Sequence, residues 1–344
     1  MNKNAIKTVL ILIRRSVLPF CSLLLLTCSN QLSSCHYDST YKKGFSIFFM
    51  PPRNVFDETD FSEHLTRMKQ NGINSIFLSP VFFTESPSSD SIFATSATLP
   101  DSQLYRAITL AEQNGFTVAL KPLVNCLDDM PRYKINPANF ETWFLSYKKF
   151  ILHYFTIAET FHHTGFVIGT ELDGVSDSRP FLHLCDSLRS NSTISIIYSG
   201  SYNHFITTTL WDHVDIMGIN AYFNLDNSEP PSPAVLHESW NYWLNLINQY
   251  AEIHNKQVMI TETGFLSRPD AAQNPGSFSG TPVSDLSVQK ECYEALLSQA
   301  ALFTSIKGIY FWQWELGDNG RIDCCDYTPR GKPAEDVVKK YWGE

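Results

Sequence analysis

Between residues 44 and 315, eight short apolar segments alternate for the most part with amphipathic ones. Each apolar segment is a nearly continuous hydrophobic run, as expected for a strand that is buried on both faces of a parallel sheet. Strands of this kind must be covered on the outside, which predicts an α/β fold. We predict strands at 44–50, 73–80, 116–122, 165–171, 193–200, 214–223, 257–265 and 307–315.

The segments between these strands carry helical patterns. In 57–72, for example, Phe61, Leu65 and Met68 recur on one helical face, and Gly72 ends the pattern. A loop rich in Pro and Ser is expected at 224–237. We predict helices at 57–72, 100–115, 139–161, 180–190, 238–255 and 284–305.

Eight parallel strands with covering helices predict closure into a barrel. A chain of 344 residues is within the range of one such domain. An open, doubly wound sheet is the main alternative, but it would lead us to expect a G-x-G-x-x-G nucleotide motif after the first strand, and the sequence has none there. The sequence therefore predicts an α/β fold formed by a single (β/α)8 TIM barrel over residues 42–344.

The first 28 residues have a different character from the rest. A basic start is followed by the apolar stretch SVLPFCSLLLLTC, which ends at Cys28. This pattern is typical of a secretory signal peptide, and the apolar run is too short for a comfortable membrane span. The segment LLTC also resembles the lipobox of bacterial lipoproteins, whose cysteine is lipidated, although Thr27 departs from the usual small residue.

These features predict export. We expect 1–28 to be a signal peptide or lipoprotein signal and 29–41 a polar linker. The mature protein is then either a lipoprotein, tethered to the membrane through a lipidated Cys28, or a secreted protein. An uncleaved N-terminal anchor helix is the alternative. Cleavage before Cys28 removes four positive charges and no negative ones, which takes the net charge from −9 to −13.

Composition excludes several classes of protein. The chain has 35 acidic and 26 basic residues and no stripe of Lys or Arg, so a nucleic-acid partner is not expected. None of the eight cysteines has the C-x-x-C spacing typical of zinc sites. The neighbours Cys324 and Cys325 leave open a vicinal disulfide or other pairings. The histidines show no H-E-x-x-H spacing, and we expect neither a metal nor a cofactor.

Barrel enzymes place their chemistry at the C-terminal ends of the strands. Glu171 and Glu262 stand at the ends of the fourth and seventh predicted strands, so both carboxylates are expected to flank one substrate. A buried carboxylate needs a partner or a function, and two at the same barrel mouth favour a function over structural ion pairs. The other polar or aromatic residues expected at the mouth are Lys121, Asn203, Tyr222 and Trp312.

Several stretches together resemble glycoside hydrolase family 113, whose characterised members act on β-mannans. IGTEL and ITETGF are similar to the acid/base and nucleophile strands of clan A glycoside hydrolases. The narrower family resemblance covers residues 43 to about 316. It is carried by KGFS, GINSIFLSP, VALKP, WDHVDIMGINAYF, FWQW and a helix similar to the family's WF-x-x-Y helix.

The resemblance implies a retaining β-glycosidase, most similar to β-mannanases, acting on a β-linked carbohydrate. It implies that Glu262 is the nucleophile and Glu171 the acid/base, and that Tyr222 donates a hydrogen bond to Glu262. Trp312 is expected to offer a flat face to a sugar ring, and Lys121 and Asn203 to bind sugar hydroxyls. Rim salt bridges or core packing remain alternatives for these three.

Two loops depart from the family pattern at the substrate mouth. The loop after the third strand keeps Arg132 but has no tryptophan, and His204 follows Asn203 where an aromatic residue is usual. These departures leave open the sugar that is recognised. Two alternatives follow. The protein could act on another β-glycan, or it could be a non-catalytic carbohydrate-binding protein with the same barrel.

Overall fold

The computed structural model describes residues 37, 39–49, 56–278, 283–317 and 324–343. The predicted export segment, with Cys28, and most of the predicted linker lie outside the described residues. Two residues from the end of that linker pack against the domain. The Tyr37 hydroxyl donates to the Leu297 carbonyl (2.7 Å), and Tyr41 is buried.

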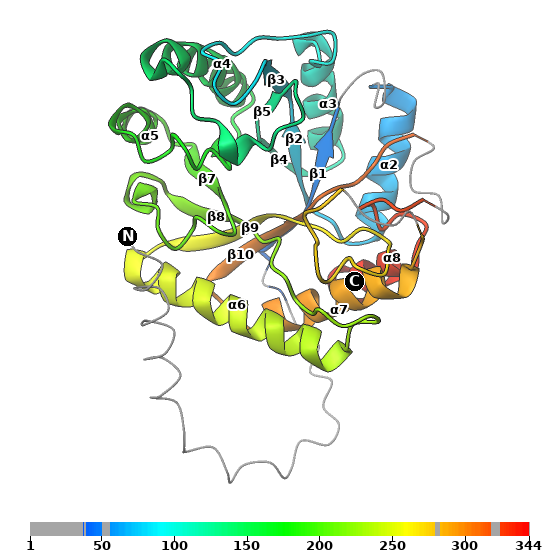
Figure 1. Cartoon of the computed structure of the whole chain (residues 1–344). Helices are drawn as coiled ribbons and strands as arrows, with labels where there is room; N and C mark the ends of the chain where they lie inside the picture. The colour runs from blue at the N-terminus through cyan, green and yellow to red at the C-terminus, as the bar shows by residue number, and fades with distance from the viewer. Residues whose placement is uncertain (1–36, 38, 50–55, 279–282, 318–323, 344) are drawn as a thin grey trace, which may run out of the picture. The chain divides into compact units, whose positions relative to one another are not determined.

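Eight parallel strands form a closed barrel, in the order β1-β10-β9-β8-β7-β6-β4-β2 (Figure 1). Helices surround it on the outside, so the predicted (β/α)8 TIM barrel is confirmed. The barrel strands are β1 (Lys42–Phe48), β2 (Ser75–Ser79), β4 (Thr117–Leu120), β6 (Gly165–Thr170), β7 (Ser195–Ser201), β8 (Ile216–Asn220), β9 (Gln257–Thr263) and β10 (Ile306–Phe311).

Two prolines create a second, smaller sheet that the sequence analysis missed. Pro80 separates β2 from β3 (Val81–Thr84), and Pro122 separates β4 from β5 (Leu123–Cys126). Proline has no N–H for a strand ladder, so each barrel strand stops there. Beyond the prolines, β3 and β5 pair with each other as a parallel two-stranded sheet that extends the barrel. Part of the loop expected after the third strand is therefore β5 and the short helix η1 (Arg132–Lys134).

The helices begin at residues suited to helix N-termini. Asp57, Asn139 and Asp285 each cap a helix by accepting a backbone N–H at its start. The helices are α2 (Glu58–Gln70), α3 (Asp101–Gln113), α4 (Phe140–Thr160), α5 (Arg179–Asn191), η2 (Leu210–His213), α6 (Pro233–His254), α7 (Leu286–Ala300) and α8 (Pro333–Trp342). In the described ranges, no helix combines the length and apolar character needed to cross a bilayer.

Two helix predictions need correction. The helix expected at 238–255 begins five residues earlier, because Pro233 occupies its first turn, where a missing N–H costs nothing. The Pro- and Ser-rich sequence is thus a loop only as far as Ser232. The helix α8 was not predicted at all. It packs Trp342 edge-on against Phe45 of β1, with ring centroids 6.2 Å apart.

The barrel interior is filled by side chains and is not a channel. One buried layer stacks the rings of Phe77 and Tyr310 with centroids 3.6 Å apart. The same cluster includes Ala119, Val167, Ile197 and Met259. A much larger cluster lies between the barrel and the helices. Because the interior is packed, substrate access is confined to the barrel ends.

Candidate active site

Glu262 lies at the end of β9 and is held by two donors. Lys121 Nζ lies 2.5 Å from Glu262 Oε2, and the Tyr222 hydroxyl donates to Glu262 Oε1 at 2.8 Å. Lys121 Nζ also donates to the Thr261 carbonyl at 3.1 Å. The Lys121 side chain is fully buried, and that of Glu262 is 7% exposed. The carboxylate is therefore fixed in orientation and paired with a cation.

Glu171 follows β6 in an unusual backbone conformation. Its φ is 51°, in the left-handed region that is rare for residues other than glycine. Its N–H still donates to the Ser199 carbonyl of β7 at 2.8 Å. Such a conformation costs about 1–3 kcal/mol and is most often found at functional sites. Here it turns the chain away from the sheet immediately after the last residue of β6.

One cation lies beside the Glu171 carboxylate. Arg132 Nη1 is 3.8 Å from Glu171 Oε2, and Arg132 Nη2 donates to Asn125 Oδ1 at 2.8 Å. The Glu171 side chain is 17% exposed and the Arg132 side chain 16%. Arg132 comes from η1 and Asn125 from β5, so the extension above the barrel supplies this part of the site.

The electrostatics of the site raise the pKa of Glu171. Burial is the largest cause, and the negative charge of Glu262 adds to it. Arg132, Asn220 and Lys121 lower the pKa but do not cancel these effects. The Glu171 carboxyl is therefore held toward its neutral, proton-carrying form.

The same site lowers the pKa of Glu262. Burial alone would raise it, but the positive charges of Lys121 and Arg132 and the hydrogen bonds from Lys121 and Tyr222 outweigh burial. Burial in turn lowers the pKa of the Lys121 ammonium, against the opposing effect of Glu262. The two glutamates are thus pushed in opposite directions, one toward the neutral acid and one toward the carboxylate. An acid and a base or nucleophile at one site can work on the same bond.

Asn220 is a site residue that the sequence analysis missed. It ends β8, and its Oδ1 accepts hydrogen bonds from Ser199 Oγ (2.6 Å) and Thr261 Oγ1 (3.2 Å). It also lies near enough to Glu171 to lower the pKa of that carboxyl. Its position could have indicated a site residue, because Asn220 is a polar residue at the end of the apolar run IMGIN.

Asn203 is placed differently from the other predicted residues. It is exposed on the loop after β7, and within the described part of the chain it has no hydrogen bond or ion pair to either glutamate. Its contact with a sugar hydroxyl stays a prediction. Lys121, Glu171, Tyr222 and Glu262 are the predicted residues that the structure brings together.

Trp312 lies just beyond β10 on the same side of the barrel. It is 8% exposed, and its ring packs against Phe48 with centroids 5.5 Å apart. Its cluster also contains Tyr222 and Tyr327. The chain after β9 passes so close that a Cβ on Gly264 would lie 2.1 Å from the Trp312 carbonyl oxygen, which only glycine permits. A sugar contact by Trp312 stays a prediction.

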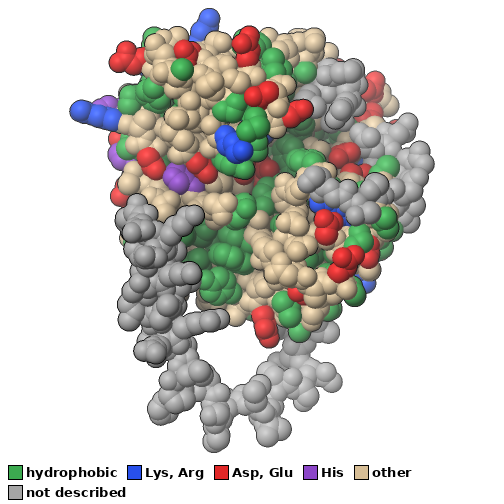
Figure 2. All heavy atoms as spheres, viewed as in Figure 1, with side chains coloured by type: hydrophobic (Ala, Val, Ile, Leu, Met, Phe, Trp, Pro, Cys, Tyr) green, Lys and Arg blue, Asp and Glu red, His purple; other side chains and the backbone are tan. Residues whose placement is uncertain are grey.

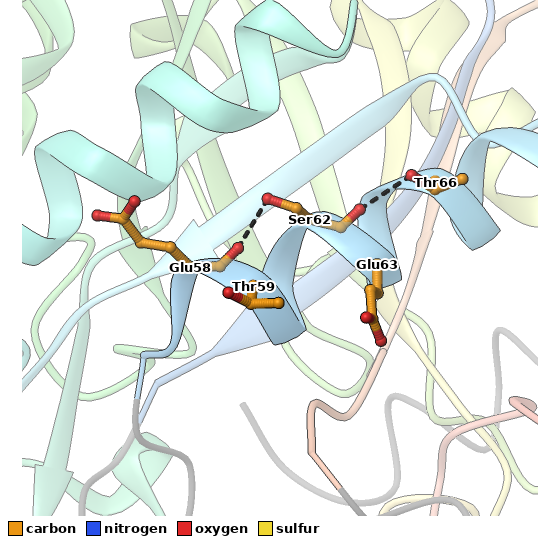
Figure 3. A pocket seen from close by; sticks show the side chains of 5 residues that line it. All are labelled: Glu58, Thr59, Ser62, Glu63 and Thr66. Atoms are coloured by element: carbon orange, nitrogen blue, oxygen red, sulfur yellow. Dashed lines mark hydrogen bonds between the residues drawn. The ribbon is translucent and has the colours of Figure 1, made fainter.

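A depression elsewhere on the described surface lacks this chemistry. Acidic side chains are spread over the face shown in Figure 2, with only scattered Lys and Arg. This depression, of about 420 Å³, lies on exposed positions of α2. Figure 3 shows its lining side chains, among which the Ser62 and Thr66 hydroxyls donate to carbonyls of their own helix. It contains neither glutamate of the pair. It is lined by Glu58, Thr59, Ser62, Glu63 and Thr66.

The cysteines within the described ranges are free thiols. This includes Cys324 and Cys325, so the vicinal disulfide that the sequence left open is not formed. Three others, Cys126, Cys185 and Cys292, are buried. In the same ranges, no group of three or more His, Cys, Asp or Glu side chains is arranged to hold a metal ion.

Comparison with solved structures shows the same barrel in glycoside hydrolases. A family 113 β-1,4-mannanase in a complex is 22% identical, with a TM-score of 0.77 over 88% of this chain and 98% of that chain. A family 113 β-mannanase, AaManA from Alicyclobacillus acidocaldarius, is 23% identical with the same TM-score over 90% and 99%. A β-glucuronidase from Faecalibacterium prausnitzii is 15% identical, with a TM-score of 0.59 over 88% and 48%. At these identities the likeness establishes a shared fold.

A search of curated proteins found no significant match. A family model described as Glycoside Hydrolase Family 113 matches residues 45–322, which is most of the chain and includes all barrel strands except the first residues of β1. Both glutamates, Lys121 and Tyr222 lie inside the matched region. The chain therefore belongs to glycoside hydrolase family 113.

Proposed function

We propose that this glycoside hydrolase is a retaining β-glycosidase that cleaves β-mannan chains, with Glu262 as nucleophile and Glu171 as acid/base. The observation that carries the proposal is the arrangement of two glutamates at one barrel mouth, with Lys121 and Tyr222 bound to Glu262 and Arg132 beside Glu171. These surroundings push the two glutamate pKa values in opposite directions. Retaining glycosidases need one carboxylate that attacks and one carboxylic acid that donates a proton. The environments of Glu262 and Glu171 match these two requirements.

In the first step, the Glu262 carboxylate attacks the anomeric carbon and forms a covalent glycosyl-enzyme. The glycosidic C–O bond breaks as the Glu171 carboxyl donates its proton to the leaving oxygen. In the second step, the Glu171 carboxylate takes a proton from water while the water oxygen attacks the anomeric carbon. The bond to Glu262 breaks, and both glutamates return to their starting states.

The neighbours of Glu262 support its role as nucleophile. Lys121 and Tyr222 each donate to a different carboxylate oxygen, which keeps the group charged and oriented before attack. As Glu262 loses its charge in the covalent intermediate, these donors stabilise it again as a leaving group. We assign binding of sugar hydroxyls to Asn203 and a hydrophobic sugar contact to Trp312. Lys121, which was also predicted to bind a sugar hydroxyl, is fully buried and holds Glu262 instead.

The choice of β-mannan rests on the two family 113 mannanases that share the fold over nearly their whole length. The loop after β7, with His204, and the loop around Arg132 depart from the family pattern at the mouth. For this reason the substrate test must include other β-glycans.

We further propose that the protein acts after export, either secreted or tethered through a lipid on Cys28. The support is the basic start, the short apolar run and the LLTC segment. A polymeric glycan does not enter cells, and an exported enzyme meets it outside.

Release of reducing sugar from a panel of β-glycans tests the function. We expect release from β-1,4-mannan by the wild type and none by Glu262→Ala. Release from another β-glycan alone would correct the substrate and keep the mechanism. Retention on a glycan without any product would instead favour a non-catalytic binding protein and overturn the proposal.

A further inference from the structure

We infer that His204 is a positioning residue for Glu171, because it clamps the loop that carries this glutamate to the neighbouring loop after β7. This inference rests on the proposed role of Glu171 as proton donor. The two loops follow adjacent barrel strands, since β6 and β7 pair along their length.

His204 lies between two carboxylates of the loop after β6. Its Nδ1 is 3.6 Å from Asp173 Oδ1, and its Nε2 is 3.3 Å from Asp177 Oδ2. The side chain is 17% exposed, and Asp173 and Asp177 are 20% and 35% exposed. One imidazole therefore joins both ends of a short segment that begins two residues after Glu171.

The end of β7 and the loop after it supply further donors to these carboxylates. Ser201 Oγ donates to Asp173 Oδ2 at 2.5 Å. Thr208 Oγ1 and the Thr209 N–H donate to Asp177 Oδ1 at 2.7 and 2.9 Å. Only His204 can carry a positive charge in this set, so it alone offsets the two negative charges.

The charge of the clamp follows from its surroundings. The hydrogen bond to Asp177 raises the pKa of His204, and Asp173 adds to this effect against the opposing effect of burial. Protonation therefore strengthens the clamp. It weakens as the pH rises through the raised pKa of His204, and it weakens again at low pH as Asp173, whose pKa is raised by burial, takes up a proton.

The segment held by His204 follows closely on the restrained backbone of Glu171. The Glu171 N–H bonds to Ser199, and the next N–H, of Leu172, donates to the Tyr198 hydroxyl at 2.9 Å. These two bonds hold the start of the loop, and the His204 contacts hold the part that follows. Without them, the left-handed conformation of Glu171 loses support on its C-terminal side.

Misplacement of Glu171 should slow hydrolysis only of those substrates whose leaving group needs its proton. A natural glycan has a poor leaving group and requires the acid, whereas a dinitrophenolate leaves without a proton. His204 does not contact the proposed nucleophile Glu262, so attack itself is unaffected. The clamp therefore predicts a loss that depends on the leaving group.

The test compares His204→Ala with His213→Ala, a matched control. His213 also forms a His–Asp pair, with Nδ1 2.8 Å from Asp186 Oδ2, but it lies on η2, ahead of β8 and away from the strand ends that carry the glutamates. We expect His204→Ala to lower kcat/KM for β-1,4-mannan by about 10- to 100-fold, as small misplacements of catalytic groups do. Its kcat/KM for dinitrophenyl β-mannoside should change by less than about threefold, because no general acid is needed. His213→Ala should leave both unchanged.

Hydrogen exchange gives a second measurement that needs no turnover. Amides of 171–178 should exchange about tenfold faster in His204→Ala, while the same amides in His213→Ala match the wild type. An equal loss on both substrates, or unchanged exchange in 171–178, overturns the clamp. If the wild type hydrolyses neither substrate, the proposed function is wrong. Hydrogen exchange in 171–178 then tests by itself whether His204 holds this segment.

Discussion

Lys121 and Glu262 meet across the barrel. Lys121 follows β4, Glu262 is on β9, and these strands are four positions apart in the closed order of eight, which is the greatest separation that the barrel allows. Their side chains nevertheless lie 2.5 Å apart, both nearly or fully buried. The contact therefore lies near the barrel axis, where it controls the charge of the proposed nucleophile.

Replacement of Lys121 by Met should raise the pKa of Glu262. Removal of one partner of a buried ion pair lowers the free energy of unfolding by about 3–5 kcal/mol, because it leaves a buried charge without a partner. The remaining carboxyl avoids this unpaired charge by taking up a proton. We expect the acidic limb of the kcat/KM profile to move to higher pH and activity at neutral pH to fall. Lys42→Met is the control, because Lys42 bonds to Thr117 at the opposite end of the barrel. An unmoved acidic limb would show that Lys121 does not set the charge of Glu262.

The wild-type pH profile should be bell-shaped. Activity needs ionised Glu262, so it falls as the pH drops through the lowered pKa of that residue. It also needs protonated Glu171, so it falls as the pH rises through the raised pKa of the acid. Measurement of kcat/KM on mannan and on a dinitrophenyl glycoside separates the limbs. With the dinitrophenyl glycoside, the fall of kcat/KM at high pH should become much smaller. If the fall stays the same with that substrate, it is caused by a group other than Glu171.

The two glutamates should respond differently to azide. Glu262→Ala should lose turnover, and azide should restore part of it with an inverted product, because the anion attacks in place of the carboxylate. Glu171→Ala should lose about 10²- to 10⁴-fold on mannan but keep the first step on a dinitrophenyl glycoside, with azide giving a retained product. The opposite stereochemistry would exchange the roles. Glu112→Ala, at the far end of the barrel, should behave as wild type.

Tyr222→Phe should reduce activity while the protein stays folded. A hydrogen bond to a charged group is worth about 1.5–3 kcal/mol, so kcat should fall about 10- to 100-fold and the acidic limb should move up slightly. The matched control is Tyr310→Phe, which removes a buried hydroxyl bonded to Ser75 (2.6 Å) away from the glutamates. It should lower the free energy of unfolding by about 1 kcal/mol and leave the limbs in place. Equal kinetics in both variants would remove Tyr222 from the site.

Mass spectrometry of the mature N-terminus tests the export proposal. We expect a chain that begins at Cys28 and carries the mass of attached lipid, recovered from the membrane fraction. An unmodified N-terminus near Cys28 in the medium would indicate secretion without a tether. A chain that begins at Met1 and fractionates with the cytosol would refute export.

Much of the architecture was predictable from local pattern. Continuous apolar runs such as 165–171, most of them followed by a helical pattern, predict a parallel sheet with covered faces, and eight of them favour closure into a barrel over an open sheet. The same runs located Glu171 and Glu262, because a strand end can be recognised where an apolar run meets a polar residue. Here the local signals and the final fold agree.

Other features depended on contacts between distant segments. Pro80 and Pro122 were visible in the sequence, but the second sheet was not. The segments that follow the two prolines can pair only because β2 and β4 are neighbours in the barrel. His204 was visible as a departure from the family pattern. Its two partners became apparent only when β6 and β7 lay side by side.

The sequence by itself determined the barrel and the two glutamates, since hydrophobic periodicity and strand ends are local properties. Only the tertiary structure decided which side chains surround them, as it joined Lys121 to Glu262 and selected Asn220 over Asn203 near Glu171. The physical reason is closure. A pKa depends on charges and burial within a few ångströms, and a closed barrel sets those distances between residues that are more than a hundred positions apart in the chain.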